Sequence, residues 1–351
     1  MNTLSNRPVV RFENVSIVFG DNPKSALPLI DAEKSRPEIQ EATGQILGVA
    51  DCSLDIHEGE TLVLMGLSGS GKSTLLRAVN GLNPVVRGRV QVRCPEQDEW
   101  RDPHACTGRQ LRQLRLDWVS MVFQQFGLLP WRSVAENVGF GLELAGMSKQ
   151  EIESRVGEQL ELVGLSDWAD KRVQELSGGM QQRVGLARAF ATQAPILLMD
   201  EPYSALDPLI RTRLQDELID LQKRLNRTII FVSHDLDEAI RIGSRIAIME
   251  GGRIIQCGTA QEILSNPANQ YVADFVANMN PLAVLHARDC MEPADTRGRG
   301  HTKAATVDED TPLKRVMEHQ VETSLPVYVE SGGKIVGVID STAVNKALLQ
   351  K

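Results

Sequence analysis

Short apolar runs alternate with polar stretches of helical spacing along most of the chain. The segments ETLVLM at 60–65, ILLMDEP at 196–202 and TIIFVSHD at 228–235 each hold a run of four apolar residues, long enough for a short buried strand. Stretches such as RTRLQDELIDLQKRL at 211–225 have helical spacing. This alternation predicts a doubly wound α/β fold with a parallel sheet, in which helices cover the strands.

The N-terminal part has a different pattern. VVRFENVSIVFG at 9–20 alternates and predicts a pair of strands, and the polar, proline-containing stretch 20–48 that follows predicts an insertion. Within it, SRPEIQEATGQI at 35–46 predicts one short helix. DCSLDIHEGETLVLM at 51–65 then predicts a strand, a glycine turn and a second strand. Residues 103–180 carry mainly helical patterns, which predict a helical subdomain.

The pattern changes again near residue 282. Short polar and basic stretches predict a linker over 282–305, which separates a domain over 1–281 from a tail over 306–351. The tail pattern predicts a helix, two strands around Gly332 and Gly333, and a final helix. Because the tail is short for an independent core, we expect it to pack against another part of a protein.

Composition narrows the choice of partners. The 351 residues are 42% hydrophobic and carry a formal net charge of -8, which argues against nucleic acid as the main partner. The five cysteines form no CxxC pair, so the sequence predicts neither a disulfide framework nor a zinc site. This cysteine usage predicts a reducing compartment. No apolar run reaches the about 18 residues that span a bilayer. If the protein serves a membrane, we expect it to dock onto other chains.

The segment GLSGSGKS at 66–73 has the residue types of a phosphate-binding loop. Its glycines let backbone N–H groups converge on a polyphosphate, Lys72 adds a positive charge, and the Ser73 hydroxyl is a magnesium ligand. A predicted strand precedes the loop and a predicted helix follows it, as this kind of site requires. The predicted nucleotide-binding residues here are Gly66, Leu67, Ser68, Gly69, Ser70, Gly71, Lys72, Ser73 and Thr74.

Two carboxylates end the predicted strand in ILLMDEP. Ligands of parallel sheets bind at the carboxyl ends of the strands, which is where Asp200 and Glu201 stand. Asp200 is suited to magnesium, and Glu201 is suited to activate water as a general base.

The segment LSGGMQQR at 176–183 starts another predicted helix. Ser177, Gly178 and Gly179 offer bare N–H groups at the positive end of the helix dipole, which attracts a phosphate. Helix capping alone would also explain Ser177. Together the three motifs resemble those of the nucleotide-binding subunits of ABC transporters, over roughly residues 9–281. In that family this signature completes the ATP site of the opposing subunit, so the resemblance adds Gln181 to the three residues above as ligands of the partner's ATP.

The resemblance implies roles for four further residues. Gln124 in MVFQQ matches the glutamine that senses magnesium and the attacking water, and Asp207 in SALD matches a residue that communicates across the dimer. His234 in FVSHD matches the histidine that contacts the γ-phosphate. Phe19 falls where the family has an aromatic residue that stacks on adenine, although a core role at a strand end also explains it.

The apolar stretch 126–147 follows Gln124 directly. In the family this region receives the coupling helices of the membrane subunits, which makes Leu128, Leu129, Trp131 and Val134 candidate contacts. Burial in the core explains any one of them equally well.

Several segments resemble the glycine betaine, choline and carnitine uptake branch of the family, and its choline systems in particular. They are the insertion with ILGVADCSL at 46–54, the loop region MGLSGSGKSTLLRAVNGLNPVVRG at 65–88, MVFQQFGLLPWRSVAENVGFGLELAG at 121–146, QYVADFVANMNPL at 270–282 and the tail. The tail is similar to one cystathionine-β-synthase (CBS) motif, a fold that works in pairs, so pairing across a homodimer and a vestigial role both stay open. Arg297, Arg299 and Lys303 form a basic cluster in the predicted linker, which either contacts anionic lipid or is solvated.

The resemblance therefore implies an ATPase subunit of an importer, with choline as the expected solute and glycine betaine, proline betaine or carnitine as the alternative. Two copies would bind two Mg-ATP head to tail at the cytoplasmic face of the bacterial inner membrane, with permease subunits and, indirectly, a solute-binding protein as partners. A soluble ABC ATPase acting on nucleic acid or ribosomes is a remote alternative. A third hypothesis keeps the ATPase and makes the tail a sensor of nucleotide or ionic strength.

Overall fold

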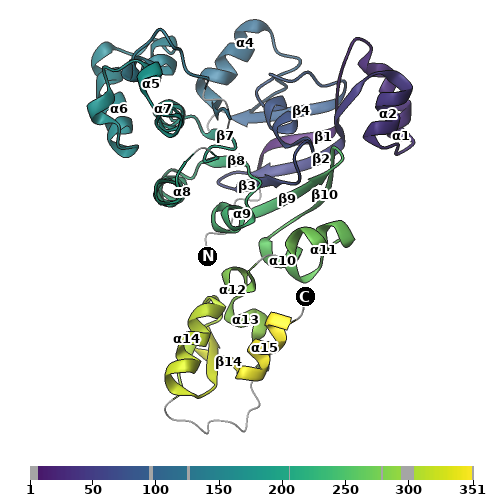
Figure 1. Ribbon diagram of the computed structural model, residues 1–351, viewed down its shortest axis with the longest axis vertical. Helices are drawn as coiled ribbons and strands as arrows, with labels where there is room; N and C mark the ends of the chain where they lie inside the picture. The colour runs from purple at the N-terminus through teal and green to yellow at the C-terminus, as the bar shows by residue number, and fades with distance from the viewer. Residues whose placement is uncertain are drawn as a thin grey trace. The chain divides into compact units, whose positions relative to one another are not determined.

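The computed structural model describes residues 7–94, 98–124, 127–204, 206–277, 280–293 and 304–349 (Figure 1). The chain divides into two compact units. The first comprises Met1–Asp235 and Ile242–Cys257, and the second comprises Leu236–Arg241 and Gly258–Lys351. Within the described ranges, no helix has both the length and the apolar composition that crossing a bilayer requires.

A six-stranded sheet forms the centre of the first unit. Its strand order is β10-β9-β3-β8-β7-β6, and the pairs from β9 to β6 are parallel. This arrangement confirms the predicted parallel α/β sheet. The strands are β3 (Thr61–Met65), β6 (Val119–Val122), β7 (Ile196–Asp200), β8 (Thr228–Val232), β9 (Arg245–Glu250) and β10 (Arg253–Gly258).

The helices of this unit include the predicted helix after the glycine-rich loop, α3, which packs against β2, β7 and β8. Helices α5, α6 and α7 pack against one another. The helices are α3 (Lys72–Ala78), α4 (Gly108–Gln113), a π-helix (Leu114–Trp118), α5 (Val134–Leu144), α6 (Lys149–Leu162), two 3-10 turns (Ser166–Trp168 and Val173–Glu175), α7 (Gly178–Ala191) and α8 (Pro208–Leu225).

The predicted helical subdomain over 103–180 is interrupted by a strand. Residues 119–122 form β6, which pairs with β7 in the central sheet. The strand is only four residues long, so its apolar pattern does not stand out from the helical patterns around it.

An antiparallel sheet of order β2-β1-β4-β5 lies beside the central sheet, with β1 (Pro8–Phe19), β2 (Ile46–His57), β4 (Arg87–Cys94) and β5 (Glu99–Arg101). The predicted strand pair at 9–20 is wrong, because β1 is one strand of 12 residues. Its pairing with β2 is shifted near Asn14, whose φ of 48° marks a bulge. A bulge of this kind breaks the alternation without ending the strand.

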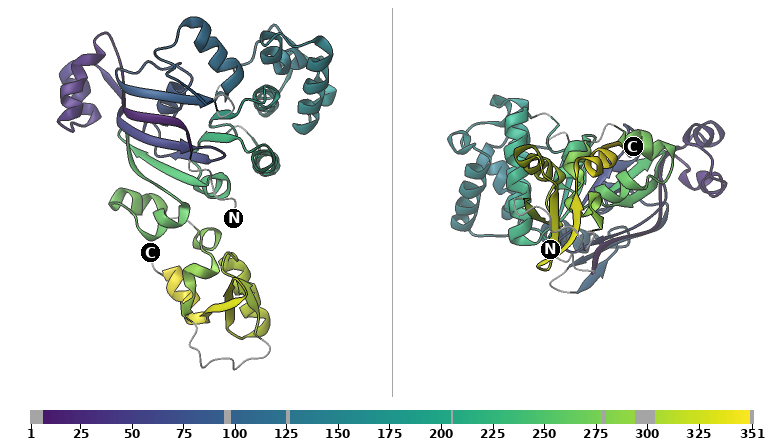
Figure 2. Two further views of the ribbon diagram at one scale, coloured as in Figure 1. Left: turned by 180° about the vertical axis from the view of Figure 1, so that it is seen from behind. Right: turned by 90° about the horizontal axis from the view of Figure 1, so that it is seen from below.

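The insertion between β1 and β2 folds into a 3-10 turn (Pro23–Ala26), α1 (Leu27–Asp31) and α2 (Arg36–Thr43). Helix α2 confirms the predicted short helix. A small core of Val18, Ala26, Ile30, Ile39, Leu47 and Ala50 holds these helices on β1 and β2. Figures 1 and 2 show α1 and α2 at the opposite side of the first unit from α5 and α6.

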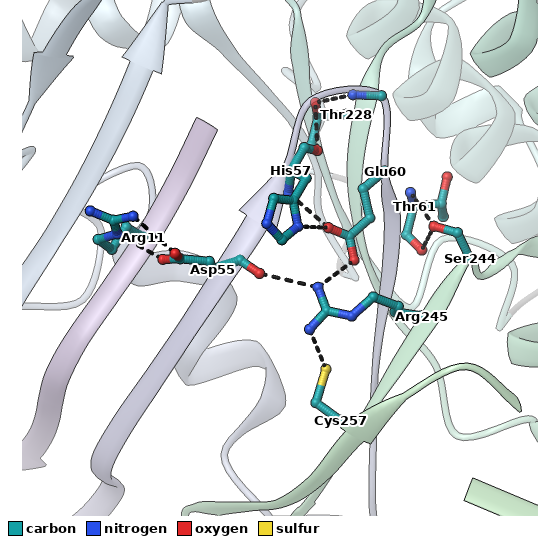
Figure 3. A network of polar contacts seen from close by, with 10 residues as sticks. Arg11, Asp55, His57, Glu60, Thr61, Thr228, Ser244, Arg245 and Cys257 are labelled. Atoms are coloured by element: carbon teal, nitrogen blue, oxygen red, sulfur yellow. Dashed lines mark hydrogen bonds and ion pairs between the residues drawn. The ribbon is translucent and has the colours of Figure 1, made fainter. Parts of the chain in front are cut away.

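A buried polar network joins the two sheets (Figure 3). Glu60 is fully buried; it accepts from Arg245 Nη1 at 2.9 Å and from the backbone N–H of His57 at 2.7 Å. Arg245 also donates to the Asp55 carbonyl at 3.3 Å and to Cys257 Sγ at 3.1 Å. Since an isolated buried charge is costly, this pairing fixes β2 against β9 and β10 and thereby positions the loop that follows β3.

The second unit holds the tail. Its sheet has the order β11-β14-β13-β12, with β12 parallel to β13 and the other pairs antiparallel. The elements are α9 (Leu236–Ile242, its last residue in the first unit), α10 (Ala260–Ser265), α11 (Gln270–Val276), α12 (Pro281–Val284), α13 (Ala287–Cys290), β11 (Glu292–Pro293), β12 (Thr306–Asp308), α14 (Leu313–Thr323), β13 (Val327–Ser331), β14 (Lys334–Ile339) and α15 (Ser341–Leu349).

The stretch predicted as a linker contains structure. Residues 281–293 form α12, α13 and β11, and Leu285, Ala287 and Cys290 are buried in the core of the tail. These elements are too short for a periodic pattern to reveal them. The predicted basic cluster Arg297, Arg299 and Lys303 lies outside the described residues.

Candidate functional site

The carboxyl ends of four parallel strands place most of the predicted site residues at one edge of the central sheet. The loop 66–71 follows β3, and Asp200 and Glu201 stand at the end of β7. His234 follows β8 and Gln124 follows β6. Because β3, β8, β7 and β6 are neighbours in the sheet, these residues converge although they are far apart in the sequence.

The glycines of the loop are required by its backbone. Gly66 has a φ of 142°, and a Cβ there would lie 2.1 Å from the Met249 carbonyl oxygen. Gly71 has a φ of 107°, and its Cβ would lie 2.5 Å from the Gly48 carbonyl oxygen. Other residues would therefore displace the loop, which confirms the conformational reason for glycine at these two positions.

Lys72 is the first residue of α3 and is buried, with its side chain folded onto the loop. Its Nζ donates to the carbonyl oxygens of Gly66 at 2.8 Å and Leu67 at 3.0 Å. Burial lowers the pKa of the Lys72 ammonium, an effect that the carboxylates of Glu201 and Asp200 oppose. The buried Ser70 Oγ has no hydrogen-bond partner. The loop thus holds the Lys72 cation where a polyphosphate would contact it.

Asp200 is fully buried and both of its oxygens are engaged. Oδ1 accepts from Ser73 Oγ at 2.6 Å, and Oδ2 accepts from Arg77 Nη2 at 2.8 Å. Arg77 lies one helical turn after Ser73 on α3, a spacing that indicates a shared face but does not identify a distant carboxylate. Sequence reasoning missed this residue, which neutralises Asp200.

The predicted magnesium ligands fit that ion. Hydroxyl, carboxylate and amide oxygens of Ser73, Asp200 and Gln124 are the hard donors that Mg²⁺ prefers, and Mg²⁺ usually takes its other ligands from phosphates and water. Among the described residues, no group of three or more His, Cys, Asp or Glu side chains could hold a metal ion. Three donors leave further coordination positions of Mg²⁺ to phosphates and water.

Gln124, Glu201 and His234 meet at one carboxylate oxygen. Gln124 Nε2 donates to Glu201 Oε2 at 3.0 Å, and His234 Nδ1 lies 3.7 Å from the same oxygen. His234 is mostly exposed, whereas Glu201 is largely buried. The three side chains can together bind and orient a water molecule.

A cavity of about 440 Å³ opens between the insertion, the loop and this carboxylate. Phe19, at the end of β1, lines it and is 36% exposed. Leu67 projects into solvent. The residues that line the cavity are Phe19, Arg36, Ile46, Leu47, Gly48, Ser68, Gly69, Gly71, Lys72, Ser73, Thr74, Gln124 and Glu201.

The signature residues are placed apart from this cavity. Ser177 caps α7 by accepting from Met180 N at 3.4 Å, and Gln181 donates to the Val173 and Leu176 carbonyls. Asp207 caps α8 by accepting from Ile210 N at 3.1 Å. Among the described lining residues there is none from 177–181, and Ser177 and Gly178 are exposed. The capping explanation of Ser177 therefore holds within one chain, and its side chain also faces solvent.

A second, more apolar cavity of about 560 Å³ lies beside α5 and α7. Leu82, Phe123, Phe140 and Leu144 contribute its apolar lining. Nearby, Trp131 is 69% exposed. Val134, in contrast, is fully buried, so its prediction as a docking contact is wrong and core burial explains it.

Known proteins resemble this chain both in sequence and in fold. The ABC transporter family profile matches residues 49–204, and the CBS domain profile matches residues 301–350. These matches confirm the predicted P-loop ABC fold with a C-terminal CBS domain. A solved structure described as the dimeric structure of MJ0796, a bacterial ABC transporter cassette, superposes with a TM-score of 0.61 at 30% identity, covering 71% of this chain and 98% of that one.

Curated relatives extend the similarity over almost the whole chain. The glycine betaine/proline betaine transport system ATP-binding protein of Salmonella typhimurium is 44% identical over 96% of this chain and 82% of its own. The glycine betaine transport ATP-binding protein of Bacillus subtilis is 42% identical over 98% of this chain and 79% of its own. The glycine betaine/carnitine transport ATP-binding protein of Listeria monocytogenes is 41% identical over 96% and 82%.

One assignment explains the glycine-rich loop and the paired carboxylates as well as the similarity to known transport proteins. The chain has an ATP-binding site with the residues of an ATPase, and it matches ATP-binding subunits of transport systems over 96–98% of its length. The chain belongs to the ABC transporter family, as an ATP-binding subunit with ATPase activity coupled to solute import, in the branch that includes the glycine betaine, proline betaine and carnitine transport proteins.

Proposed function

We propose that this chain hydrolyses ATP to drive uptake of a fully N-methylated amine, with glycine betaine or a close analogue as the solute. The observation that carries the proposal is the likeness to glycine betaine transport proteins over 96–98% of the chain, tail included. Relatives named for methionine or for spermidine and putrescine import match only 70–72% of the chain. We therefore take the proposed solute class from the relatives that match almost the whole chain.

Choline is the finer alternative within this class. It rests on the resemblance of the insertion and the loop region to choline systems, whereas the relatives above are named for betaines and carnitine. An ATP-binding subunit does not contact the solute, so the residues of the site do not choose between these compounds.

In the proposed reaction, water attacks the γ-phosphorus of ATP in line with the bond to the leaving oxygen, which departs with ADP. Glu201 orients this water and accepts its proton, since its carboxylate lies between Gln124 and His234. Lys72 and His234 donate to the oxygens of the transferred phosphoryl group. Magnesium, held by Ser73, Asp200 and Gln124 oxygens, would neutralise charge on the phosphates. Phe19 would stack on the adenine.

The complete site would need a second copy of the chain. Ser177, Gly178, Gly179 and Gln181 of one copy would bind the ATP held by the loop of the other, and Asp207 would lie at the interface. Their separation from the cavity of their own chain supports this arrangement. ATP binding would close the head-to-tail dimer, and hydrolysis would release it.

Permease subunits at the cytoplasmic face of the bacterial inner membrane would dock at the apolar cavity beside α5. Its open apolar lining and the exposed Trp131 support this docking surface, to which Leu128 and Leu129 would contribute. A solute-binding protein would act on the other side of the membrane, without contacting this chain.

The test is solute-stimulated hydrolysis by the purified complex of this chain with its permease and solute-binding protein. We expect glycine betaine, proline betaine, carnitine or choline to raise the ATPase rate, and methionine or spermidine to leave it unchanged. A complex carrying Glu201→Gln measures the contaminating activity. Stimulation by methionine or spermidine instead of the methylated amines would refute the proposed solute class.

A further inference from the structure

Arg36 reaches from the insertion to the phosphate-binding loop. It is the first residue of α2, and its Nη1 donates to the Gly69 carbonyl while its Nη2 donates to the Gly48 carbonyl. The backbones of Gly71 and Gly252 pack against the same guanidinium, since a Cβ at either position would lie 3.3 or 3.1 Å from Nη2. The partly buried guanidinium thus packs against backbone, and Arg36 lines the cavity.

The position of Arg36 is fixed by the fold of the insertion. Ser35 and Glu38 form a capping box at the start of α2, and Ile39 is fully buried in the small core on β1 and β2. A capping box and a buried apolar anchor hold the first turn of a helix in place. The guanidinium therefore faces the loop because of the fold, and no ligand is needed to place it there.

Among the residues that the structure describes, no carboxylate pairs with this cation. Both of its hydrogen bonds go to neutral carbonyls, and its Nε is buried without a hydrogen-bond partner. Burial lowers the pKa of the Arg36 guanidinium, with no acidic neighbour opposing it. Arg87, in contrast, takes both Asp31 of the insertion and Asp51 as partners. A partly buried cation without a counter-charge is costly, so an anion that enters this cavity gains an unusually strong partner.

The cavity that Arg36 lines is the one that holds Lys72, Ser73 and Glu201. A guanidinium has five N–H donors, of which the two carbonyls use two. One N–H remains on each of Nη1 and Nη2, and a polyphosphate is the anion that this site receives. We propose that Arg36 is a further nucleotide-binding residue, which pairs with the phosphates of bound ATP and makes the insertion part of the nucleotide site. This inference rests on ATP binding by the loop and is independent of the solute.

The test distinguishes pairing of Arg36 with the phosphates of ATP from a role that only stabilises the conformation of the loop. Binding of Mg-ATP, Mg-ADP and adenosine is measured by calorimetry on the full-length chain and on Arg36→Gln and Arg36→Lys. We expect Arg36→Gln to weaken ATP and ADP binding about tenfold, or about 1.4 kcal/mol, and to leave adenosine binding unchanged. Arg36→Lys keeps the charge and should retain most of the ATP affinity.

Lys34→Gln is the matched control, because it removes one positive charge from the same insertion. Lys34 is exposed and pairs with Glu38 at 2.9 Å, outside the cavity lining. Its ATP affinity should equal that of the unchanged chain. Wild-type affinity for ATP in Arg36→Gln would overturn the proposal, as would an equal loss in Arg36→Gln and Arg36→Lys that extends to adenosine. Failure of the unchanged chain to bind ATP would instead overturn the assignment of the loop.

Discussion

Glu201 is held in an unfavourable backbone conformation. Its φ is 48°, a value that few residues other than glycine adopt. Four hydrogen bonds of its backbone keep it there. Its N–H donates to the Val232 carbonyl at 3.2 Å, and its carbonyl accepts from Gln182 Nε2 at 3.3 Å and from both the N–H and the Oγ of Ser204, at 3.3 and 3.1 Å. Strain of this kind persists where the surroundings enforce it, commonly at functional sites. The carboxylate is therefore presented to Gln124 and His234 at the end of β7.

Glu201→Gln tests the proposed general base. The substitution keeps the shape and removes the proton acceptor, so we expect ATP affinity to persist and hydrolysis to fall by about 100-fold or more. Phosphate release and ATP binding are measured on the same preparation. Glu158→Gln, which alters an exposed carboxylate on α6, should change neither quantity. Near-normal turnover in Glu201→Gln would remove Glu201 as the base.

The sequence alone identified the residues whose chemistry is carried by local motifs. The loop 66–73 and the pair Asp200 and Glu201 are recognisable because their spacing serves a phosphate. Arg77 and Arg36 were missed because their partners are remote in sequence, at Asp200 and at Gly48 and Gly69. No periodicity indicates which buried carboxylate or carbonyl a lone arginine will reach.

At the scale of elements, most strands and helices of ordinary length were predicted and the shortest were not, and the eight-residue strand β4 was also missed. Unbroken apolar runs of four residues became the five-residue strands β3, β7 and β8, whereas β6, β11 and β12 have two to four residues in all and were missed. The tail depends on such short pieces, because its core includes Leu285, Ala287 and Cys290 beside residues of α14 and β13. This shared core agrees with the expectation that the tail is too short to fold by itself.

Deletion of residues 281–351 tests what the tail does. This cut also removes α12 and α13, whose residues complete the core of the tail. All residues that line the nucleotide cavity belong to the first unit, so ATP hydrolysis should stay within about twofold. A large loss of hydrolysis would contradict this independence. Unchanged dependence of transport on salt and nucleotide would count against a sensing role for the tail.

At the scale of the whole molecule, the chain carries two surfaces that we propose bind phosphate, and they do not share a cavity. The loop lines the cavity, whereas the exposed N-terminus of α7 with Ser177 and Gly178 contributes no described residue to it. The N-terminus of a helix attracts phosphate. Since the N-terminus of α7 does not line the cavity of its own chain, we propose that it binds the ATP held by a second copy. We therefore predict that catalysis requires two chains with ATP between them.

The most direct measurement of this claim is the mass of Glu201→Gln in solution by light scattering, with and without Mg-ATP. We expect the mass of this variant to rise from 38.7 kDa to twice that value when Mg-ATP is added. Adding Ser177→Arg should abolish the dimer and leave ATP binding intact. Ser148→Arg, at the exposed N-cap of α6, is the matched control and should dimerise. A chain that stays at 38.7 kDa with ATP bound, while the wild-type monomer hydrolyses ATP at full rate, would contradict the account.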